Sequence, residues 1–458
     1  MRRFSSTLIL LFLACSVLRA QAGSPVKTTL HDGVRIICKQ ESSSSLVAIT
    51  VFVQAGSAEE NLPDAGIGSM VADALLTGTT NQNSDTISTS IGNVGGNVKA
   101  IWEPDVTQVR ALILPSQFAD AAYLLSDVLK NADFPDASVE NSRQDMLSRI
   151  QQRTDDVFDS TDDRLRGSLY SGTAYALPQI GTIQSVKKLT REDLVAYFHR
   201  YYRPDTILIS VVGNIDPKLV ASTFAGDLSD FVRPATSHVA PLVVPDPSIS
   251  AQPLVIKSYR GDVTADLMMA GYLAPGIGTP DYPAMVVANA MLGGMKTGLM
   301  FKNLRTKKKF GYELASTYAT QIGVSDETGY ILYAPTTAGA GQSGGADQTP
   351  DVKDALIEQF KLLYGAPPSD VDLARAKKFV IGSYLLAHER IEDRSYYLGY
   401  SEIACKDFGG YQFDANYADV INAVTAADVV RVCKKYFSGQ PVISLLLPGD
   451  PAAGVKSY

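Results

Sequence analysis

The sequence predicts an α+β protein made of two homologous halves, each an α/β sandwich. Three observations predict it. A helix-and-strand segment recurs near the C-terminus, strands and helices follow the same order in both parts, and a proline-rich stretch separates them. At 458 residues, the chain is long enough for two units of ordinary domain size.

The repeated segment joins an amphipathic helix to a buried strand. Its first copy begins at Thr190 and its second at Thr425, and each threonine can cap the helix that follows. Asp193 and Asp428 occupy the same place in the two copies, 428 − 193 = 235 residues apart. This separation predicts two equivalent units of similar length.

Continuous or alternating apolar runs predict strands, and apolar residues every three or four positions predict helices. In the first half the expected strands are 34–38, 46–54, 106–114 and 207–212, and the expected helices are 66–76, 116–131, 136–153 and 190–202. In the second half the expected strands are 267–273, 328–334 and 442–447, and the expected helices are 282–292, 296–309, 351–364, 368–392 and 425–437. Ser116 is expected to cap the helix that starts with it.

The same patterns place the domain borders. The expected divisions are an export signal at 1–22, an N-terminal domain at 23–233, an extended proline-rich linker at 234–253 and a C-terminal domain at 254–458. The signal consists of Arg2 and Arg3, an apolar run and a small-residue cleavage site ending at Ala22. We expect an exported, periplasmic protein, with a lipid anchor on Cys15 as the alternative.

Composition excludes several classes of protein. Lys and Arg number 41 against 48 Asp and Glu, a net charge of −7, which argues against nucleic-acid binding. Cys38, Cys405 and Cys433 lack the spacing of a thiolate zinc site, so they are buried thiols or include a Cys405–Cys433 bridge. No later apolar run is long enough for a membrane span.

Four segments, in order and spacing, resemble the M16 zinc peptidases, the family of insulin-degrading enzyme, pitrilysin and the mitochondrial processing peptidase. These segments are 65–79, 94–98, 180–186 and 299–312. The resemblance covers nearly the whole chain after the signal and implies two α/β halves of the M16 metallopeptidase type. The repeat described above predicts the same division independently.

The family's zinc motif is His-x-x-Glu-His on a helix, which places two imidazoles on one helical face with a glutamate as general base, and a later glutamate completes the site. At the matching positions this chain has Ser69, Ala72 and Asp73, and Arg149 at the later ligand. These residues predict no metal in this chain, because a guanidinium repels a cation.

Without the resemblance, these residues have ordinary structural interpretations. Asp73 is then a solvated helix residue, and Asp145 pairs with Arg149 four positions on. The expected packing face of the helix is Met70, Val71, Ala74 and Leu75. The four histidines are expected on separate elements, outside any site: His31, His199, His238 and His388.

The resemblance also implies an arginine and a tyrosine seven residues apart, facing the zinc across the substrate cleft. Arg305 and Tyr312 have this spacing. A guanidinium can hold a peptide carbonyl, and a phenol can donate to the oxyanion of a tetrahedral intermediate. Gly311 is expected to make the turn between the helix of Arg305 and the strand of Tyr312.

A chain without zinc ligands that keeps this pair resembles one subunit of the heterodimeric members of the family. The resemblance implies a partner subunit that carries His-x-x-Glu-His and zinc, and a peptide substrate bound between the two subunits. The alternative is a non-catalytic binding or scaffold protein, for which Arg305 and Tyr312 are dispensable. A self-sufficient hydrolase ranks last, since no nucleophile motif stands out.

Overall fold

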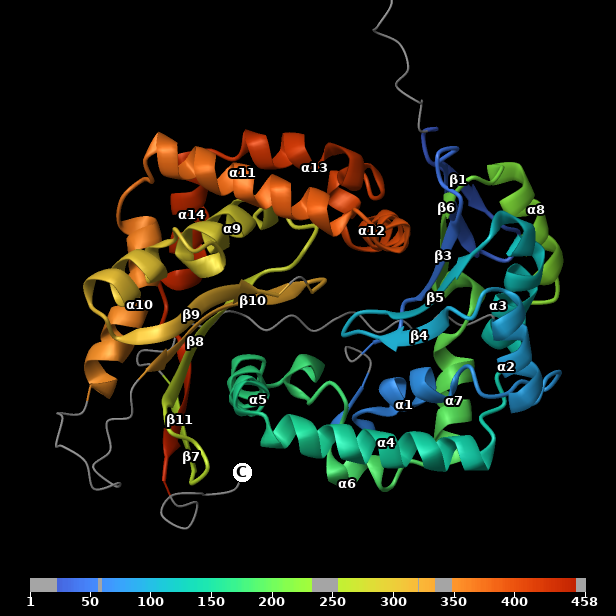
Figure 1. Ribbon diagram of the computed structural model, residues 1–458, viewed down its shortest axis with the longest axis horizontal. Helices are drawn as coiled ribbons and strands as arrows, with labels where there is room; N and C mark the ends of the chain where they lie inside the picture. Colours follow the sequence, from blue (N-terminus) through green and yellow to red (C-terminus); the bar gives the residue numbers. More distant parts are fainter. Residues whose placement is uncertain (1–22, 57–59, 233–253, 320, 334–347, 450–458) are drawn as a thin grey trace, which may run out of the picture.

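The protein folds into two halves, each a mixed sheet covered by helices (Figure 1). The computed structural model describes residues 23–56, 60–232, 254–319, 321–333 and 348–449. The expected export signal at 1–22, the linker at 234–253, Cys15 and His238 lie outside these residues. The expected α+β class with two α/β halves is confirmed.

The two sheets share one topology. The N-terminal sheet runs β1-β2-β6-β3-β5-β4, with bounds β1 Val26–Thr29, β2 Arg35–Gln40, β3 Val47–Val53, β4 Val98–Trp102, β5 Thr107–Ile113 and β6 Ile207–Gly213. The C-terminal sheet runs β7-β11-β8-β10-β9, with bounds β7 Leu254–Arg260, β8 Asp266–Pro275, β9 Gly311–Tyr318, β10 Val324–Tyr333 and β11 Val442–Pro448. Apart from β1, strand order and direction agree, with β2–β6 and β7–β11 as the parallel pairs.

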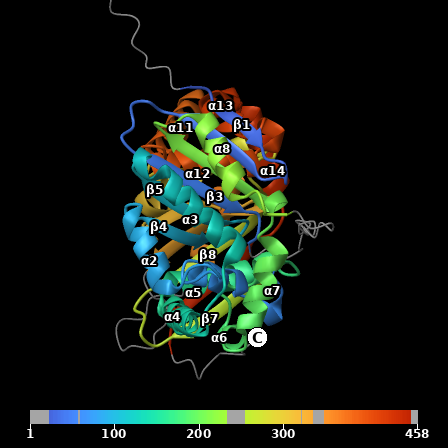
Figure 2. The ribbon, with the colours of Figure 1, turned by 90° about the vertical axis from the view of Figure 1, so that its right-hand side faces the viewer.

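Helices cover both sheets. Those of the N-terminal half are α1 Ile67–Ala74, α2 Ser84–Asn93, α3 Phe118–Asn131, α4 Asp136–Asp155, α5 Val157–Leu169, α6 Ile183–Val186, α7 Arg191–Tyr201 and α8 Pro217–Asp227. Those of the C-terminal half are α9 Tyr282–Asn289, α10 Thr349–Gly365, α11 Asp370–Ala387, α12 Ile391–Ala404, α13 Gln412–Ala423 and α14 Ala426–Phe437, with wider π-helical segments η6 Ala290–Gly294 and η7 Phe301–Lys307. Figure 2 looks onto the N-terminal half.

The predicted helix caps of the repeat are confirmed. Thr190 accepts a hydrogen bond from the backbone N–H of Asp193, and Thr425 accepts one from that of Asp428. In each copy the aspartate carboxylate accepts from the threonine N–H in return, which completes a capping box. The local sequence thus sets the start of α7 and α14 in the same way.

Each half lends one helix to the other. Helix α5 packs on β8 and β11, and α12 packs on β3 and β6 (Figure 1). The two helices begin 391 − 157 = 234 residues apart, so they are equivalent in the repeat. Leu165 of α5 fits against Gly271. In the other half the glycine is on the helix and the large side chain is on the strand, since Gly399 of α12 leaves room for Phe52 of β3.

Several expected boundaries are wrong; for example, the strand expected to start at 328 already begins at Val324. Ser116 caps no helix, because Pro115–Gln117 forms a separate 3-10 turn and α3 begins at Phe118. The helix expected over 368–392 ends at Ala387, where His388 Nδ1 lies 2.7 Å from the Tyr384 carbonyl and Nε2 lies 2.7 Å from Asp414. These bonds hold the side chain at the break before α12.

The predicted core cysteines are free thiols. Cys38, Cys405 and Cys433 are all buried and unbridged, so the Cys405–Cys433 alternative is wrong. Burial raises the pKa of the Cys38 and Cys405 thiols to about 12. In the part of the chain that the structure describes, no helix has the length and apolarity to span a bilayer.

Candidate functional site

The positions of the lost zinc motif lie on α1. The predicted packing face is confirmed, since Met70, Val71, Ala74 and Leu75 are buried. The helix starts at Gly66, which has a left-handed backbone (φ 90°). The buried carboxylate of Glu60 accepts hydrogen bonds from the N–H groups of Gly66 (2.8 Å) and Gly68 (2.9 Å). Burial raises the Glu60 pKa to about 7 against the opposing effect of these two bonds.

Asp73 of α1 and Arg149 of α4 form an ion pair with each other. The prediction that Asp145 is the partner of Arg149 is therefore wrong, whereas the prediction that Asp73 is a solvated helix residue is confirmed, since Asp73 is exposed. The packing of α1 on α4 brings together two residues 76 positions apart in the sequence. The fold thus places side by side, as an ion pair, the two residues that the resemblance aligns with zinc-ligand positions.

This set of residues does not fit a zinc ion. Ser69 and Ala72 are buried, and neither offers an imidazole or carboxylate, while Arg149 brings a positive charge. Within the described ranges, no three His, Cys, Asp or Glu side chains gather as metal ligands would. The histidines that the structure describes lie apart, with His388 bound to Asp414 and His31 at the surface.

Arg305 and Tyr312 meet in the C-terminal half. The guanidinium carbon of Arg305, on η7, lies 4.5 Å from the centre of the Tyr312 ring and 4.9 Å from that of Phe301. This cation–π stacking holds the planar cation over the phenol. The sequence predicted the two residues, and the structure places them next to each other.

The backbone around this pair departs from regular structure at three points. Arg305 sits in a π-helical segment, a rare form that occurs frequently at functional sites. Tyr312 has no partner on β10, because Gly311 pairs with Tyr333 and Glu313 with Leu332, so Tyr312 is the extra residue of a β-bulge. Between them, Lys309 has a left-handed backbone with φ 57°.

The expected role of Gly311 as the turn residue is wrong. The left-handed position is Lys309, and Gly311 already belongs to β9. A Cβ at Gly311 would lie 2.6 Å from the Leu332 carbonyl oxygen, so glycine is needed for close contact with β10. The bulge then turns Tyr312 outward, and 81% of its surface is exposed.

Arg305 and Tyr312 line an open hollow of about 510 Å³. Its other walls come from the end of η7, from β10 and from the turn before β8. Among the described residues, no ion pair neutralises Arg305 or Lys309. The hollow therefore offers an exposed phenol and, stacked on it, a guanidinium without an ion-pair partner among the described residues, beside β9, which is an edge strand of its sheet.

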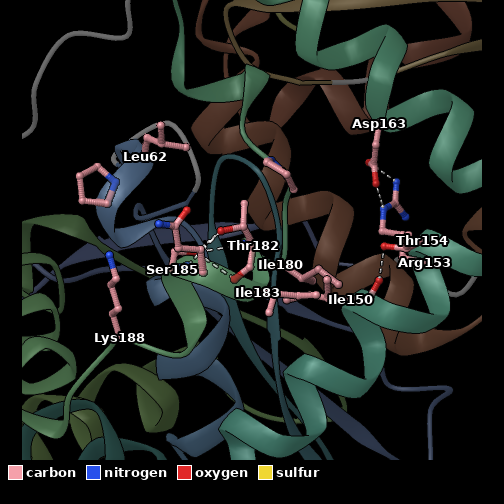
Figure 3. Close-up of a pocket in the computed structure, with 14 residues that line it drawn as sticks. Leu62, Ile150, Arg153, Thr154, Asp163, Ile180, Thr182, Ile183, Ser185 and Lys188 are labelled. Atoms are coloured by element: carbon pink, nitrogen blue, oxygen red, sulfur yellow. Dashed lines mark hydrogen bonds and ion pairs between the residues drawn. The ribbon is translucent and has the colours of Figure 1, made fainter. Parts of the chain in front are cut away.

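A larger hollow of about 660 Å³ lies beside α4 and α6 (Figure 3). Two pairs of its polar side chains are bonded to each other. Arg153 donates two hydrogen bonds of 2.8 Å to Asp163, and Thr182 and Ser185 form a capping box. Because the resemblance points to Arg305 and Tyr312, we take the hollow that they line as the candidate site.

Two family models match the chain. Residues 35–183 match the one described as Insulinase (Peptidase family M16), and residues 188–380 match the one described as Peptidase M16 inactive domain. An uncharacterized zinc protease, YmxG of Bacillus subtilis, is 22% identical over 92% of this chain and 97% of its own length.

Two solved structures share the fold. A protease from Helicobacter pylori has a TM-score of 0.82 and 16% identity, covering 93% of this chain and 100% of the other. A structure described as a peptidase M16 inactive domain, from Pseudomonas fluorescens, has a TM-score of 0.79 and 17% identity, covering 93% and 98%.

Proposed function

Because the chain belongs to the M16 peptidase family, whose two models together cover most of residues 35–380, we propose that it is the zinc-lacking subunit of a heterodimeric M16 peptidase. The observation that carries this proposal is the contrast between the two walls. The positions that the resemblance aligns with zinc ligands hold the Asp73–Arg149 pair, whereas the exposed Tyr312 lines a hollow together with Arg305.

The proposed partner is a subunit that carries His-x-x-Glu-His, holds the zinc ion and supplies the attacking water and its base. A peptide lies extended between the subunits, along the edge strand β9. Arg305 donates hydrogen bonds to a substrate carbonyl, and the Tyr312 hydroxyl donates to the oxyanion as it forms. The exposed phenol of Tyr312 suits this role, since a partner's site can reach it.

Reconstitution tests this proposal. The full chain, the partner peptidase and their mixture are each assayed on unfolded peptides, and zinc is measured in each. We expect zinc in the partner alone and strong cleavage in the mixture alone. Stoichiometric zinc and cleavage by the single chain would refute the proposal. Equal cleavage by the partner with or without this chain would instead favour the scaffold alternative.

The location of the protein is a second part of the proposal. We propose that the chain is exported and processed after Ala22, on the sequence pattern of 1–22 alone. N-terminal sequencing of the periplasmic fraction should then begin at Gly23. A mature chain beginning at a lipid-modified Cys15 would replace this proposal with a membrane anchor.

A further inference from the structure

The hollow beside Arg305 and Tyr312 has a one-sided charge. Its charged lining residues are Arg305 and Lys309, and no acidic side chain lines it among the described residues. The remaining walls are largely apolar and aromatic, including Phe310, Leu332 and Tyr333. Arg305 and Lys309 lack an acidic partner in this lining, so the open hollow can attract an anion through a partly solvated charge pair.

Lys309 reaches this hollow through an unfavourable backbone. Its φ of 57° lies in the left-handed region, which glycine and asparagine adopt easily and lysine does not. Such residues gather at binding and catalytic sites, where the side chain has a use that offsets the strain. The neighbouring lysines, Lys307 and Lys308, lie outside the lining of the hollow.

We propose that this hollow binds a carboxylate of the substrate peptide, with Lys309 as the residue that selects it. The carboxylate comes either from an aspartate or glutamate side chain or from the C-terminus of the peptide. Arg305 and Tyr312 remain free to act on the scissile carbonyl. This inference deepens the proposed function and rests on it for the role of the hollow in cleavage.

The test measures peptide binding by the full chain without its partner. A neutral, amidated, fluorescent peptide is compared with versions in which one glutamine is changed to glutamate, position by position, and with a version that has a free C-terminal carboxylate. We expect at least one carboxylate peptide to bind about three- to tenfold tighter than the neutral one at low salt, as a partly exposed charge pair predicts. The peptide that binds best identifies the source of the carboxylate.

Three variants assign the preference to Lys309. Lys309→Asn removes the charge but keeps a residue that accepts a left-handed backbone, so we expect the fold to persist and the preference to disappear. Lys309→Arg should retain it. Lys307→Asn removes an equal charge outside the hollow and should also retain it. Circular dichroism confirms that each variant is folded.

Equal binding of all peptides to the wild-type chain would overturn the inference, as would a preference that survives Lys309→Asn. These outcomes differ from failure of the proposed function, which is a matter of cleavage by the reconstituted pair. If the chain prefers carboxylate peptides but does not increase cleavage by the partner, the binding site is supported and its role in catalysis is refuted. In an active pair, Lys309→Asn should raise KM for the carboxylate peptide more than it lowers kcat.

Discussion

The α1–α4 region and the η7–β9 region contain the residues that the resemblance assigns to the two sides of a peptidase site, but their structures differ. The first has regular helices, and its charged pair, Asp73 and Arg149, is neutralised internally. The second combines a π-helical segment, a left-handed lysine and a β-bulge, and its Lys309 and Tyr312 are exposed. In the first region the charged side chains bind each other, whereas in the second an irregular backbone presents an exposed phenol.

The largest expected effect comes from Tyr312→Phe. Removing the hydroxyl should lower kcat of the reconstituted pair about 100- to 1000-fold, because one oxyanion donor contributes about 2.7–4 kcal/mol to the transition state. Stability should hardly change, since the side chain is 81% exposed. Steady-state kinetics and thermal unfolding measure the two effects.

The matched control is Tyr123→Phe, which removes another exposed hydroxyl, on α3. It should leave kcat unchanged. If Tyr312→Phe also leaves kcat unchanged, the Tyr312 hydroxyl takes no part in catalysis, and the η7–β9 region does not differ from the α1–α4 region in this respect.

Glu60→Gln tests the structural role of the α1 region. Burial raises the Glu60 pKa to about 7, so the folded state favours the protonated form. The contribution of this protonation to the free energy of unfolding is complete below pH about 4.5 and is lost as the pH rises through about 7. The loss should amount to roughly 2–3 kcal/mol in the wild type and be absent in Glu60→Gln.

Denaturant unfolding at several pH values between 4.5 and 7.5 gives the free energy of unfolding as a function of pH. The slope of this dependence should differ between the wild type and Glu60→Gln. Glu192→Gln changes an exposed glutamate on α7 and should keep the wild-type slope. Identical slopes in the wild type and in Glu60→Gln would show that the Glu60 pKa is not raised.

Gly399→Ala tests how closely helix α12 packs on the N-terminal sheet. A methyl group there would collide with Phe52 and Ser210, so we expect a loss of about 1–3 kcal/mol in stability. Gly382→Ala, on α11, meets nothing within 4 Å and should be neutral or slightly stabilising. Equal stability of the two variants would contradict the tight fit of α12.

The smallest effect is expected from Arg149→Ala. Its ion pair with Asp73 is partly exposed, with 42% and 30% of the two side chains accessible, so its loss should cost less than about 1 kcal/mol. Cleavage by the reconstituted pair should not change. A large fall in kcat would show that the neutralised wall still takes part in the reaction.

Patterns that depend on near neighbours were predictable from the sequence. The capping boxes at Thr190 and Thr425 depend on residues three apart, and the apolar strands of the repeat on continuous runs. The packing face of α1 follows from helical spacing. The Arg305–Tyr312 pair was found through the resemblance and not through local spacing.

Features that depend on distant contacts were not predictable. Spacing favoured Asp145 as the partner of Arg149, but helix packing brings Asp73 closer from another part of the chain. The bulge at Tyr312 arises from how β9 meets β10, and local rules assigned the turn to Gly311 instead of Lys309. The exchange of α5 and α12 likewise leaves no local signal.

That exchange has a consequence for how the protein is made. During synthesis the N-terminal half emerges first, but the face of its sheet formed by β3 and β6 stays uncovered until α12, ending at Ala404, has left the ribosome. The nascent chain must therefore keep a large apolar surface from aggregating while the second half is translated. If the two halves were expressed from separate genes, each would expose the apolar sheet face that the other half's helix covers. We expect these fragments to be soluble only when they are produced together.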